Sequence, residues 1–246
     1  GVSFMEDDNN LPFNASRLLT SIIQKSSYET NACEIIKQEI YENERLATHF
    51  VGKTLEQLKQ YVHNANDEQN VFGLYGLHAL IAIVDSYDGG CVIVEEDCDS
   101  SNEEKLGSRD DNENFKQQLT DCQIAELPFF NVLFIQIGQF KEIIELAIEK
   151  DEDGLHCPFY CVEVMKLFSS LVRLECKYAD HVILKHGILK LFVTIYFKYL
   201  SNNTLLVHVT ETLAFLLLNK NPVTSELLSY RRKSGDILRR AFLDDT

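Results

Sequence analysis

Histidine and cysteine side chains that could hold a metal ion gather in the second half of the sequence. The string HCPFYC contains His156, Cys157 and Cys161, and His181 and His186 follow it. Structural zinc sites usually use closely spaced pairs such as C-x-x-C, because such a pair places two ligands on one turn. The spacings here are looser. We therefore expect no bound metal and no cofactor, with the cysteines facing a core and the histidines on helix surfaces.

A second string, ATHFVGKT, runs from Ala47 to Thr54 and shares its last residues with phosphate-binding P-loops. A P-loop needs a glycine where Ala47 stands, because its backbone N–H groups wrap around phosphates in conformations that favour glycine. It also needs a strand directly before it. Neither requirement is met. We interpret the string as a turn between two helices at Gly52, with Thr54 as the N-cap of the second helix.

The short motifs that mark common catalytic sites are absent from the sequence. It contains no G-x-S-x-G, no H-E-x-x-H and no G-x-G-x-x-G. The carboxylates of its acidic stretch are too numerous to indicate one general acid and one general base. We expect a protein that is not an enzyme. A remote alternative is a helical enzyme with a dispersed site, in which His156, His181 or His186 meets carboxylates.

Charge is unevenly distributed along the 246 residues, whose formal net charge is −15. Between Asp88 and Asp121 there are 11 acidic and 3 basic residues, a net charge of −8. This acidity disfavours a nucleic acid or an anionic membrane as the partner, because both would be repelled. Residues 95–114 have too little apolar surface to offset the entropy lost on ordering, so we expect a disordered acidic loop there.

Membrane and secretion signals are also absent from the sequence. The most apolar window, Leu205–Leu218, is interrupted by His208 and Glu211 and is shorter than the about 20 apolar residues of a membrane span. No signal peptide is visible at the start. The seven cysteines are scattered and form no C-x-x-C pair, which is typical of reduced thiols. We expect a cytoplasmic protein, and Gly1 in place of Met indicates a fragment of a longer chain.

Apolar residues recur at helical spacing through most of the sequence, and short polar turns separate the runs. Asn14 is expected to be the N-cap of the first helix. The expected helices are 16–25, one from about 31, 54–64, 71–84, about 122–150, 159–175, 179–185, 188–200, 204–219 and 224–242. Helix pairs without strands are typical of armadillo or HEAT repeats. We predict an all-α, irregular helical-repeat solenoid that is part of one domain over residues 1–246, interrupted by the acidic loop.

Three segments resemble the SAPS domain, the helical-repeat core of regulatory subunits of serine/threonine-protein phosphatase 6. NASRLLTSIIQKS is similar to the family's N-A-S-x-x-L-x-x-I-I run, and LATHFVGKTLEQLKQYVHNANDEQNVFGLYGLHALIAIVD resembles a helix pair of the family. The third segment, from Met165 to Val209, resembles an L-L-R helix, a glycine turn and the string F-F-K-Y-x-W-N-N-F-L-H. Its matching residues are Arg173, Gly187, Ile188, Leu189, Phe197, Lys198, Tyr199, Asn202, Asn203, Leu205 and Val209. The chain departs from the family at Ser201, Thr204 and Leu206, where the family has tryptophan, phenylalanine and histidine.

The resemblance implies a non-catalytic regulatory or scaffold subunit. Such a subunit binds the catalytic subunit of a phosphatase-6-type serine/threonine phosphatase and directs it to substrates, with ankyrin-repeat subunits as further partners. The candidate partner-binding residues are Phe197, Lys198, Tyr199, Asn202 and Asn203. The two asparagines have a second interpretation, a turn in which their side-chain oxygens cap a helix. The alternative function is a general armadillo-like adaptor with unrelated partners.

Overall fold

The computed structural model describes residues 11–25, 31–63, 72–87, 124, 126–151 and 157–218. In these ranges every regular element is a helix, as the all-α prediction requires. The helices are α1 (Leu11–Lys25), α2 (Asn31–Glu42), α3 (Glu44–His63), α4 (Phe72–Asp85), α6 (Pro128–Lys150), α7 (Phe159–Arg173), α8 (Lys177–Lys185), α9 (Ile188–Lys198) and α10 (Asn203–Leu218). The predicted acidic loop at 95–114 and the predicted helix at 224–242 lie outside the described residues.

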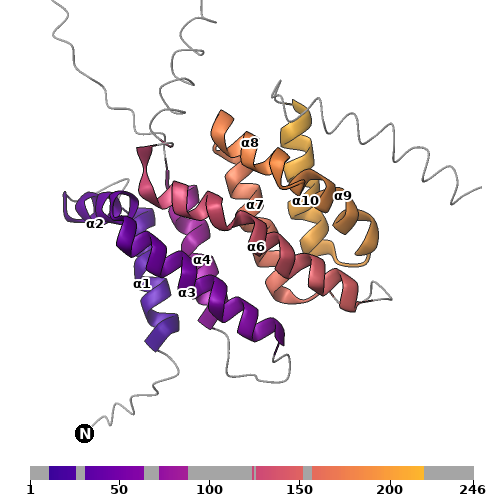
Figure 1. The fold of residues 1–246 in the computed structure, drawn as a ribbon, viewed down its shortest axis with the longest axis horizontal. Coiled ribbons are helices and arrows are strands. Elements are labelled where there is room, and N and C mark those ends of the chain that lie inside the picture. Colours follow the sequence, from indigo (N-terminus) through magenta and orange to yellow (C-terminus); the bar gives the residue numbers. More distant parts are fainter. Residues whose placement is uncertain are drawn as a thin grey trace, which may run out of the picture.

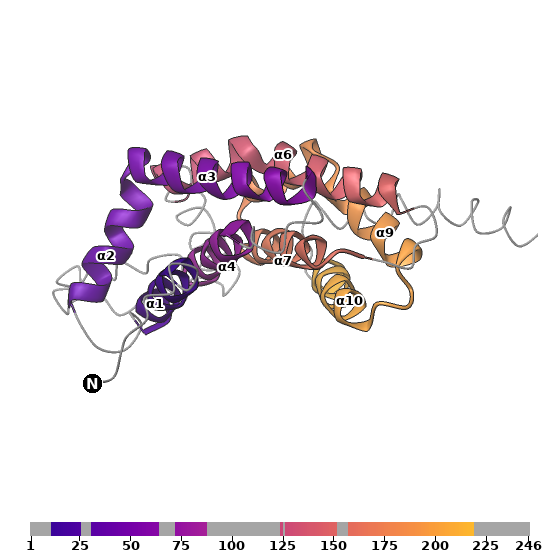
Figure 2. The same cartoon turned by 90° about the horizontal axis from the view of Figure 1, so that it is seen from below.

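The helices pack in two layers (Figure 1). In one layer α1 packs on α4, α4 on α7, and α7 on α10. We call these four helices the four-helix row, and Figure 2 shows them nearly end-on along a shallow arc, with α1 and α10 at its ends. The long helices α3 and α6 lie side by side in the other layer. Figure 2 shows α3 and α6 on one side of the row, so the opposite long face of the row stays uncovered by other described helices.

Apolar stripes on the helices form the core between the two layers. The side chains of Leu58, Leu77, Ile137 and Phe140 are fully buried there. Aromatic rings close the core near the start of α6, where the ring of Tyr41 stacks on that of Phe130 at a centroid distance of 5.8 Å. The Tyr41 hydroxyl donates a hydrogen bond to the Ile83 carbonyl at 2.7 Å, so this buried polar group is satisfied.

Two glycines allow α3 and α4 to approach closely. A Cβ atom on Gly73 would lie 2.7 Å from the backbone nitrogen of Leu58, and one on Gly76 would lie 2.4 Å from the Thr54 hydroxyl oxygen. Both distances are shorter than carbon contacts allow. The spacing of the two helices therefore depends on the absence of side chains at these positions.

Lysine side chains from neighbouring elements hydrogen-bond to the C-terminal carbonyls of three helices. Lys150 of α6 donates to the carbonyl of Val62 in the last turn of α3 at 3.4 Å, and Lys198 of α9 donates to that of Ile148 in α6 at 2.6 Å. Lys37 of α2 donates to the Ser86 carbonyl just beyond α4. Each ammonium group meets carbonyls that the helix leaves unpaired, at the negative end of the helix dipole.

Two predicted N-caps, Asn14 and Thr54, are wrong. Asn14 lies inside α1. Thr54 lies inside α3, which continues from Glu44 to His63 without a turn at Gly52. The residues Ala47, Val51, Leu55, Leu58 and Val62 form one buried stripe on both sides of Gly52. Burial of this stripe outweighs the roughly 1 kcal/mol that a glycine costs inside a helix. The cap of α3 is Asn43, whose side-chain oxygen accepts a hydrogen bond from the backbone nitrogen of Leu46 at 3.0 Å.

The predicted break at Gly187 is confirmed. This glycine separates α8 from α9 and has a φ of 64°, a left-handed conformation that favours glycine. Helix α7 ends at Arg173, before the predicted 175, and Glu175 also has a positive φ, of 51°. Helix α8 begins earlier than predicted, at Lys177, because the Cys176 sulfur accepts a hydrogen bond from the Ala179 nitrogen at 3.2 Å and caps it.

Candidate functional site

The turn between α9 and α10 contains the residues that the sequence marks as a candidate binding surface. The Asn202 side-chain oxygen accepts a hydrogen bond from the backbone nitrogen of Leu205 at 3.0 Å, so Asn202 is the N-cap of α10. Asn203 is exposed and is the first residue of that helix. The turn interpretation of the two asparagines is therefore confirmed for Asn202, while a partner contact by either residue stays a prediction.

The other three candidates of this turn differ in their exposure. Tyr199 is only 1% exposed, so its side chain belongs to the core, and a partner contact by Tyr199 stays a prediction. The Lys198 ammonium group is held by the Ile148 carbonyl. Phe197 is 46% exposed and packs edge-on against the ring of Tyr196 at a centroid distance of 5.3 Å. Phe197 and Leu200 are thus two exposed apolar residues near the end of α9.

A buried carboxylate lies on the uncovered face of the four-helix row. Glu163 of α7 is 2% exposed, and its two oxygens contact Nε2 of His78 in α4 at 2.9 Å and Nζ of Lys166 at 2.6 Å. The side chains of His78 and Lys166 are 42% and 31% exposed. We call these three residues the carboxylate cluster. Its negative charge is covered from solvent, whereas both of its basic groups reach the surface.

The environment of the carboxylate cluster shifts the pKa of two side chains. Burial alone would raise the pKa of Glu163, but hydrogen bonds from His78 and Lys166 outweigh burial and lower it below its ordinary value. The pKa of His208 in α10 is lowered by burial and by the nearby charge of Lys166, which together outweigh the opposite effect of Glu211. These surroundings therefore favour the ionised form of Glu163 and the neutral form of His208.

Polar contacts continue from this cluster toward the far end of α7. The Thr212 hydroxyl of α10 lies 2.7 Å from the hydroxyl of Ser169 in α7 and 2.8 Å from the carbonyl of His208. Beyond them, Arg173 of α7 and Glu211 of α10 form an exposed ion pair at 3.5 Å. Positions 163, 166 and 173 follow helical spacing, so the polar groups of α7 share one face.

A hollow between α1 and α4 continues the same surface on the side of the carboxylate cluster away from α10. It has a volume of about 440 Å³ and is lined by residues of these two helices, among them Arg17, Ser21, Tyr75, His78 and Asp85. His78 belongs both to this hollow and to the carboxylate cluster. Polar side chains that reach solvent thus occur on all four helices of the row, among them Arg17, His78, Lys166 and Glu211. We call the surface on which they lie the polar face; the contact between Ser169 and Thr212 is buried beneath it.

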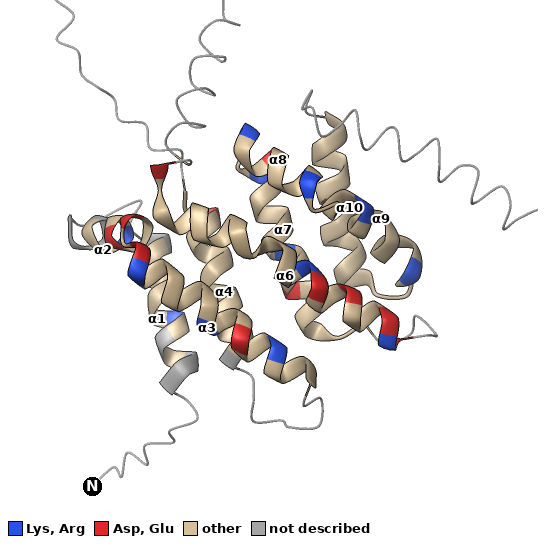
Figure 3. Ribbon diagram, viewed as in Figure 1, with Lys and Arg blue, Asp and Glu red and all other residues tan. Residues whose placement is uncertain are grey.

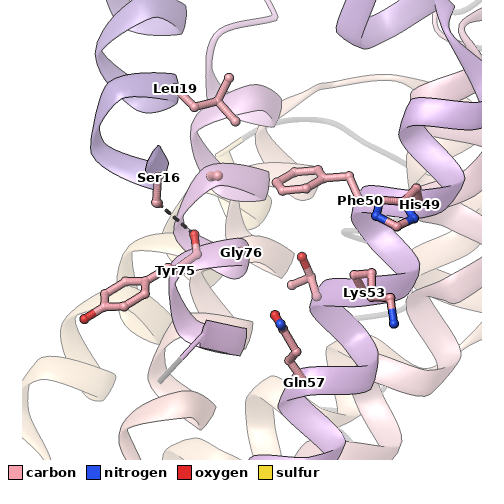
Figure 4. A pocket seen from close by; sticks show the side chains of 10 residues that line it. Ser16, Leu19, His49, Phe50, Lys53, Gln57, Tyr75 and Gly76 are labelled. Atoms are coloured by element: carbon pink, nitrogen blue, oxygen red, sulfur yellow. Dashed lines mark hydrogen bonds between the residues drawn. The ribbon is translucent and has the colours of Figure 1, made fainter. Parts of the chain in front are cut away.

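A second hollow, of about 470 Å³, opens between α1, α3 and α4 (Figure 4). Its wall is largely apolar, with Leu19 and Phe50 facing the space. The Ser16 hydroxyl at its edge donates to the Tyr75 carbonyl at 2.9 Å. The Ser16 hydroxyl thus donates to a backbone carbonyl of α4. A carbonyl is not a base that could activate this hydroxyl as a nucleophile.

The residues considered for a metal or a dispersed catalytic site do not come together in the part of the chain that can be described. No group of three or more His, Cys, Asp or Glu side chains there could hold a metal ion. His181 is exposed on α8, and the His186 ring lies over α6, where a Cβ on Gly138 would be 3.1 Å from it. Cys161 is buried and Cys157 half-buried, while His156 lies outside the described residues.

The carboxylate cluster was missed in the sequence, although one signal was present. Glu163 is the single acidic residue within the apolar run FYCVEVMKLF, and Lys166 follows it by three positions on the same helical face. A lone carboxylate in such a run indicates either a helix edge or a buried pair. The histidine that completes the pair comes from α4, far away in the chain, and no local pattern marks it.

The fold and this surface define an all-helical protein with an uncovered polar face on one row of helices. None of the helices described is long and apolar enough to cross a membrane. Comparison of the chain with protein-family models, with curated proteins and with solved structures finds no match in any of the three.

Proposed function

We propose that the chain is a non-catalytic scaffold that binds another protein on the polar face of the four-helix row. The observation that carries this proposal is that polar groups reach solvent on all four helices of that face, from the hollow between α1 and α4 to the ion pair between α7 and α10. The stacking of α1, α4, α7 and α10 supports an armadillo- or HEAT-like solenoid. Solenoids of this type commonly bind partners along such long faces.

The partner that we propose first is the catalytic subunit of a phosphatase-6-type serine/threonine phosphatase. This part of the proposal rests on the resemblance of the segment from Met165 to Val209 to the SAPS domain. That segment covers most of α7, all of α8 and α9, and the first half of α10, so it contributes Lys166 and Arg173 to the polar face. Ankyrin-repeat proteins are proposed as further members of the same assembly.

The experiment compares two exposed charge reversals. Arg173→Glu changes the polar face at an ion pair whose side chains are 50% and 55% exposed. Lys53→Glu is the matched control on α3, where the Lys53–Glu56 pair is 56% and 52% exposed. Both variants are expected to fold, because exposed pairs contribute at most about 1 kcal/mol. The tagged chain and each variant are used to capture phosphatase catalytic subunits from cell extract.

We expect the unmodified chain and Lys53→Glu to enrich the phosphatase-6 type over related phosphatases, and Arg173→Glu to lose this enrichment at least about tenfold, as a reversed charge at an interface costs more than 1.4 kcal/mol. Enrichment of unrelated proteins in place of the phosphatase supports the general adaptor instead. The departures at Ser201, Thr204 and Leu206 are the observation that favours that second candidate. Equal capture by both variants would place the binding site away from the polar face.

A further inference from the structure

Two cysteines lie at the N-terminus of α7, the end of the helix opposite to Arg173. Cys157 precedes the N-cap Pro158 and is half-buried, while Cys161 lies in the first turn and is 1% exposed. Both are free thiols. The Pro158 carbonyl accepts a hydrogen bond from the Cys157 sulfur at 3.7 Å and from the Cys161 backbone nitrogen at 3.0 Å, so the two cysteines lie side by side at this helix end. One sulfur is therefore accessible from solvent, and the second is covered directly behind it.

The surroundings of this pair distinguish the two thiols. Interaction with the Cys161 thiol lowers the pKa of Cys157 and outweighs the opposite effects of partial burial and of the Asp151 charge, and the same interaction together with burial raises the pKa of Cys161. The Cys157 sulfur also lies at the positive end of the α7 dipole, which favours a thiolate there. Charge is thus directed to the sulfur that solvent can reach.

A buried hydroxyl completes the environment of the two sulfurs. Tyr199 at the end of α9 is 1% exposed, and within the described residues its hydroxyl has no direct hydrogen-bond partner. Burial raises the pKa of Tyr199, and the Asp151, Cys157 and Cys161 groups raise it further, so this hydroxyl stays neutral.

We propose that Cys157 and Cys161 form a reversible oxidation site, at which a hydroperoxide converts the two thiols into an intramolecular disulfide. The Cys157 thiolate attacks the terminal oxygen of the hydroperoxide. The S–O bond forms as the O–O bond breaks, and the alkoxide or hydroxide that leaves takes up a proton. Cys157 is then a sulfenic acid, and the hydroperoxide has been reduced to an alcohol or to water by two electrons.

The second step uses the covered thiol. The Cys161 sulfur attacks the sulfenic sulfur of Cys157, the S–S bond forms, and the S–O bond breaks. The departing hydroxide takes the proton of the Cys161 thiol and leaves as water. An accessible thiolate next to a covered resolving thiol is the arrangement that peroxide-sensitive protein thiols use. A dithiol reductant returns the pair to its starting state.

Cys176 provides an internal control for this reactivity. It is 0% exposed, and its sulfur accepts a hydrogen bond from the Ala179 backbone nitrogen at 3.2 Å as the cap of α8. It therefore shares the buried state of Cys161 without the exposed neighbour. The folded protein is expected to oxidise Cys157 at least about tenfold faster than Cys176, because thiolate character and access both favour Cys157.

Digestion with trypsin places the pair Cys157 and Cys161 in one peptide and Cys176 in another. Cleavage after Lys150 and Lys166 yields one peptide, 151–166, with Cys157 and Cys161 as its only cysteines, and Cys176 falls in the peptide 174–177. The chain is exposed to hydrogen peroxide, unfolded, alkylated, digested and analysed by mass spectrometry. We expect peptide 151–166 to lose two hydrogen atoms and both alkyl labels, and to regain the labels after prior reduction with dithiothreitol, while peptide 174–177 stays alkylated.

Two variants separate the roles of the two sulfurs. Cys161→Ser removes the resolving thiol, so the sulfenic acid at Cys157 should accumulate and be trapped by dimedone. Cys157→Ser should leave Cys161 as slow to react as Cys176. Circular dichroism of each variant shows whether it is folded before oxidation. The proposal is overturned if peptide 151–166 keeps both labels under peroxide, if dimedone labels neither protein, or if Cys176 reacts as fast as Cys157.

Discussion

Replacement of Glu163 with glutamine tests whether the carboxylate cluster stabilises the fold. The change removes the negative charge while it keeps the size of the side chain and one oxygen that can accept a hydrogen bond. His78 and Lys166, at 2.9 and 2.6 Å in the native protein, would then face a neutral amide at a position that is 2% exposed. We expect a folded but less stable protein.

The magnitude follows from the two contacts. A hydrogen bond to a charged group contributes about 1.5–3 kcal/mol when it is well shielded. The basic partners are 42% and 31% exposed, so solvent screens both interactions, and glutamine retains part of one. We therefore expect a loss of about 2 kcal/mol in the free energy of unfolding, which corresponds to a decrease of about 4–8 °C in Tm for a chain of this size.

The effect should depend on pH in a defined direction. The pKa of Glu163 is lowered in the folded protein from its ordinary value of 4.5, so the unfolded chain binds the proton more readily. The stabilisation is then fully present above about pH 4.5 and is lost as the pH falls through the folded pKa. Urea unfolding followed by circular dichroism should show a constant difference between native protein and Glu163→Gln from pH 7 to 5, and a shrinking one below.

A matched variant shows whether burial causes the effect. Glu145 of α6 pairs with Lys141 at 3.0 Å in an i,i+4 arrangement, and its side chain is 45% exposed, on the charged second half of α6 that Figure 3 shows. Glu145→Gln should cost less than about 0.5 kcal/mol. If Glu163→Gln is equally mild, or if its effect persists unchanged at pH 3, the reasoning about the cluster is refuted.

Four further variants test other parts of the fold by the same urea titration. Asn202→Ala removes the N-cap of α10 and should cost about 1 kcal/mol, whereas Asn203→Ala should cost less than half as much; equal costs would contradict the capping role. Gly76→Ala places a Cβ 2.4 Å from the Thr54 hydroxyl oxygen and should cost about 1–3 kcal/mol by forcing α3 and α4 apart, so a neutral result would mean that Thr54 rotates away freely. Tyr199→Phe removes a buried hydroxyl without a direct partner among the described residues and should be neutral or stabilising by up to about 1 kcal/mol; a clear destabilisation would show that the hydroxyl is satisfied.

Local patterns in the sequence predict the helices of the second half well. The break at Gly187 and the turn at Asn202 depend on single residues whose backbone preference or side-chain oxygen acts on the adjacent helix. Such signals need no information about the rest of the fold. The same kind of reasoning failed at Gly52, where the burial of the continuous stripe on α3 was stronger than the local preference for a turn.

The candidate site was less predictable because it depends on contacts between distant segments. Tyr199 carries no local mark of burial, and the structure places it in the core beside the ends of α6 and α7. The carboxylate of Glu163 finds His78 across 85 residues of chain, the difference between positions 163 and 78. Pairings of this kind are fixed by how the helices stack, and the periodicity of one helix contains no information about its neighbour's register.

The lysines at the helix ends have a consequence for how parts of the protein open. Lys198 attaches α9 to the end of α6, and Lys150 attaches α6 in turn to the end of α3. These two bonds link segments that are far apart in the chain through the last turns of successive helices. Amide hydrogen exchange at the ends of α3 and α6 should therefore accelerate together when Lys198 is replaced by methionine. Loss of the Lys198 bond lets the last turn of α6 fray, and this fraying also breaks the bond from Lys150 to the last turn of α3.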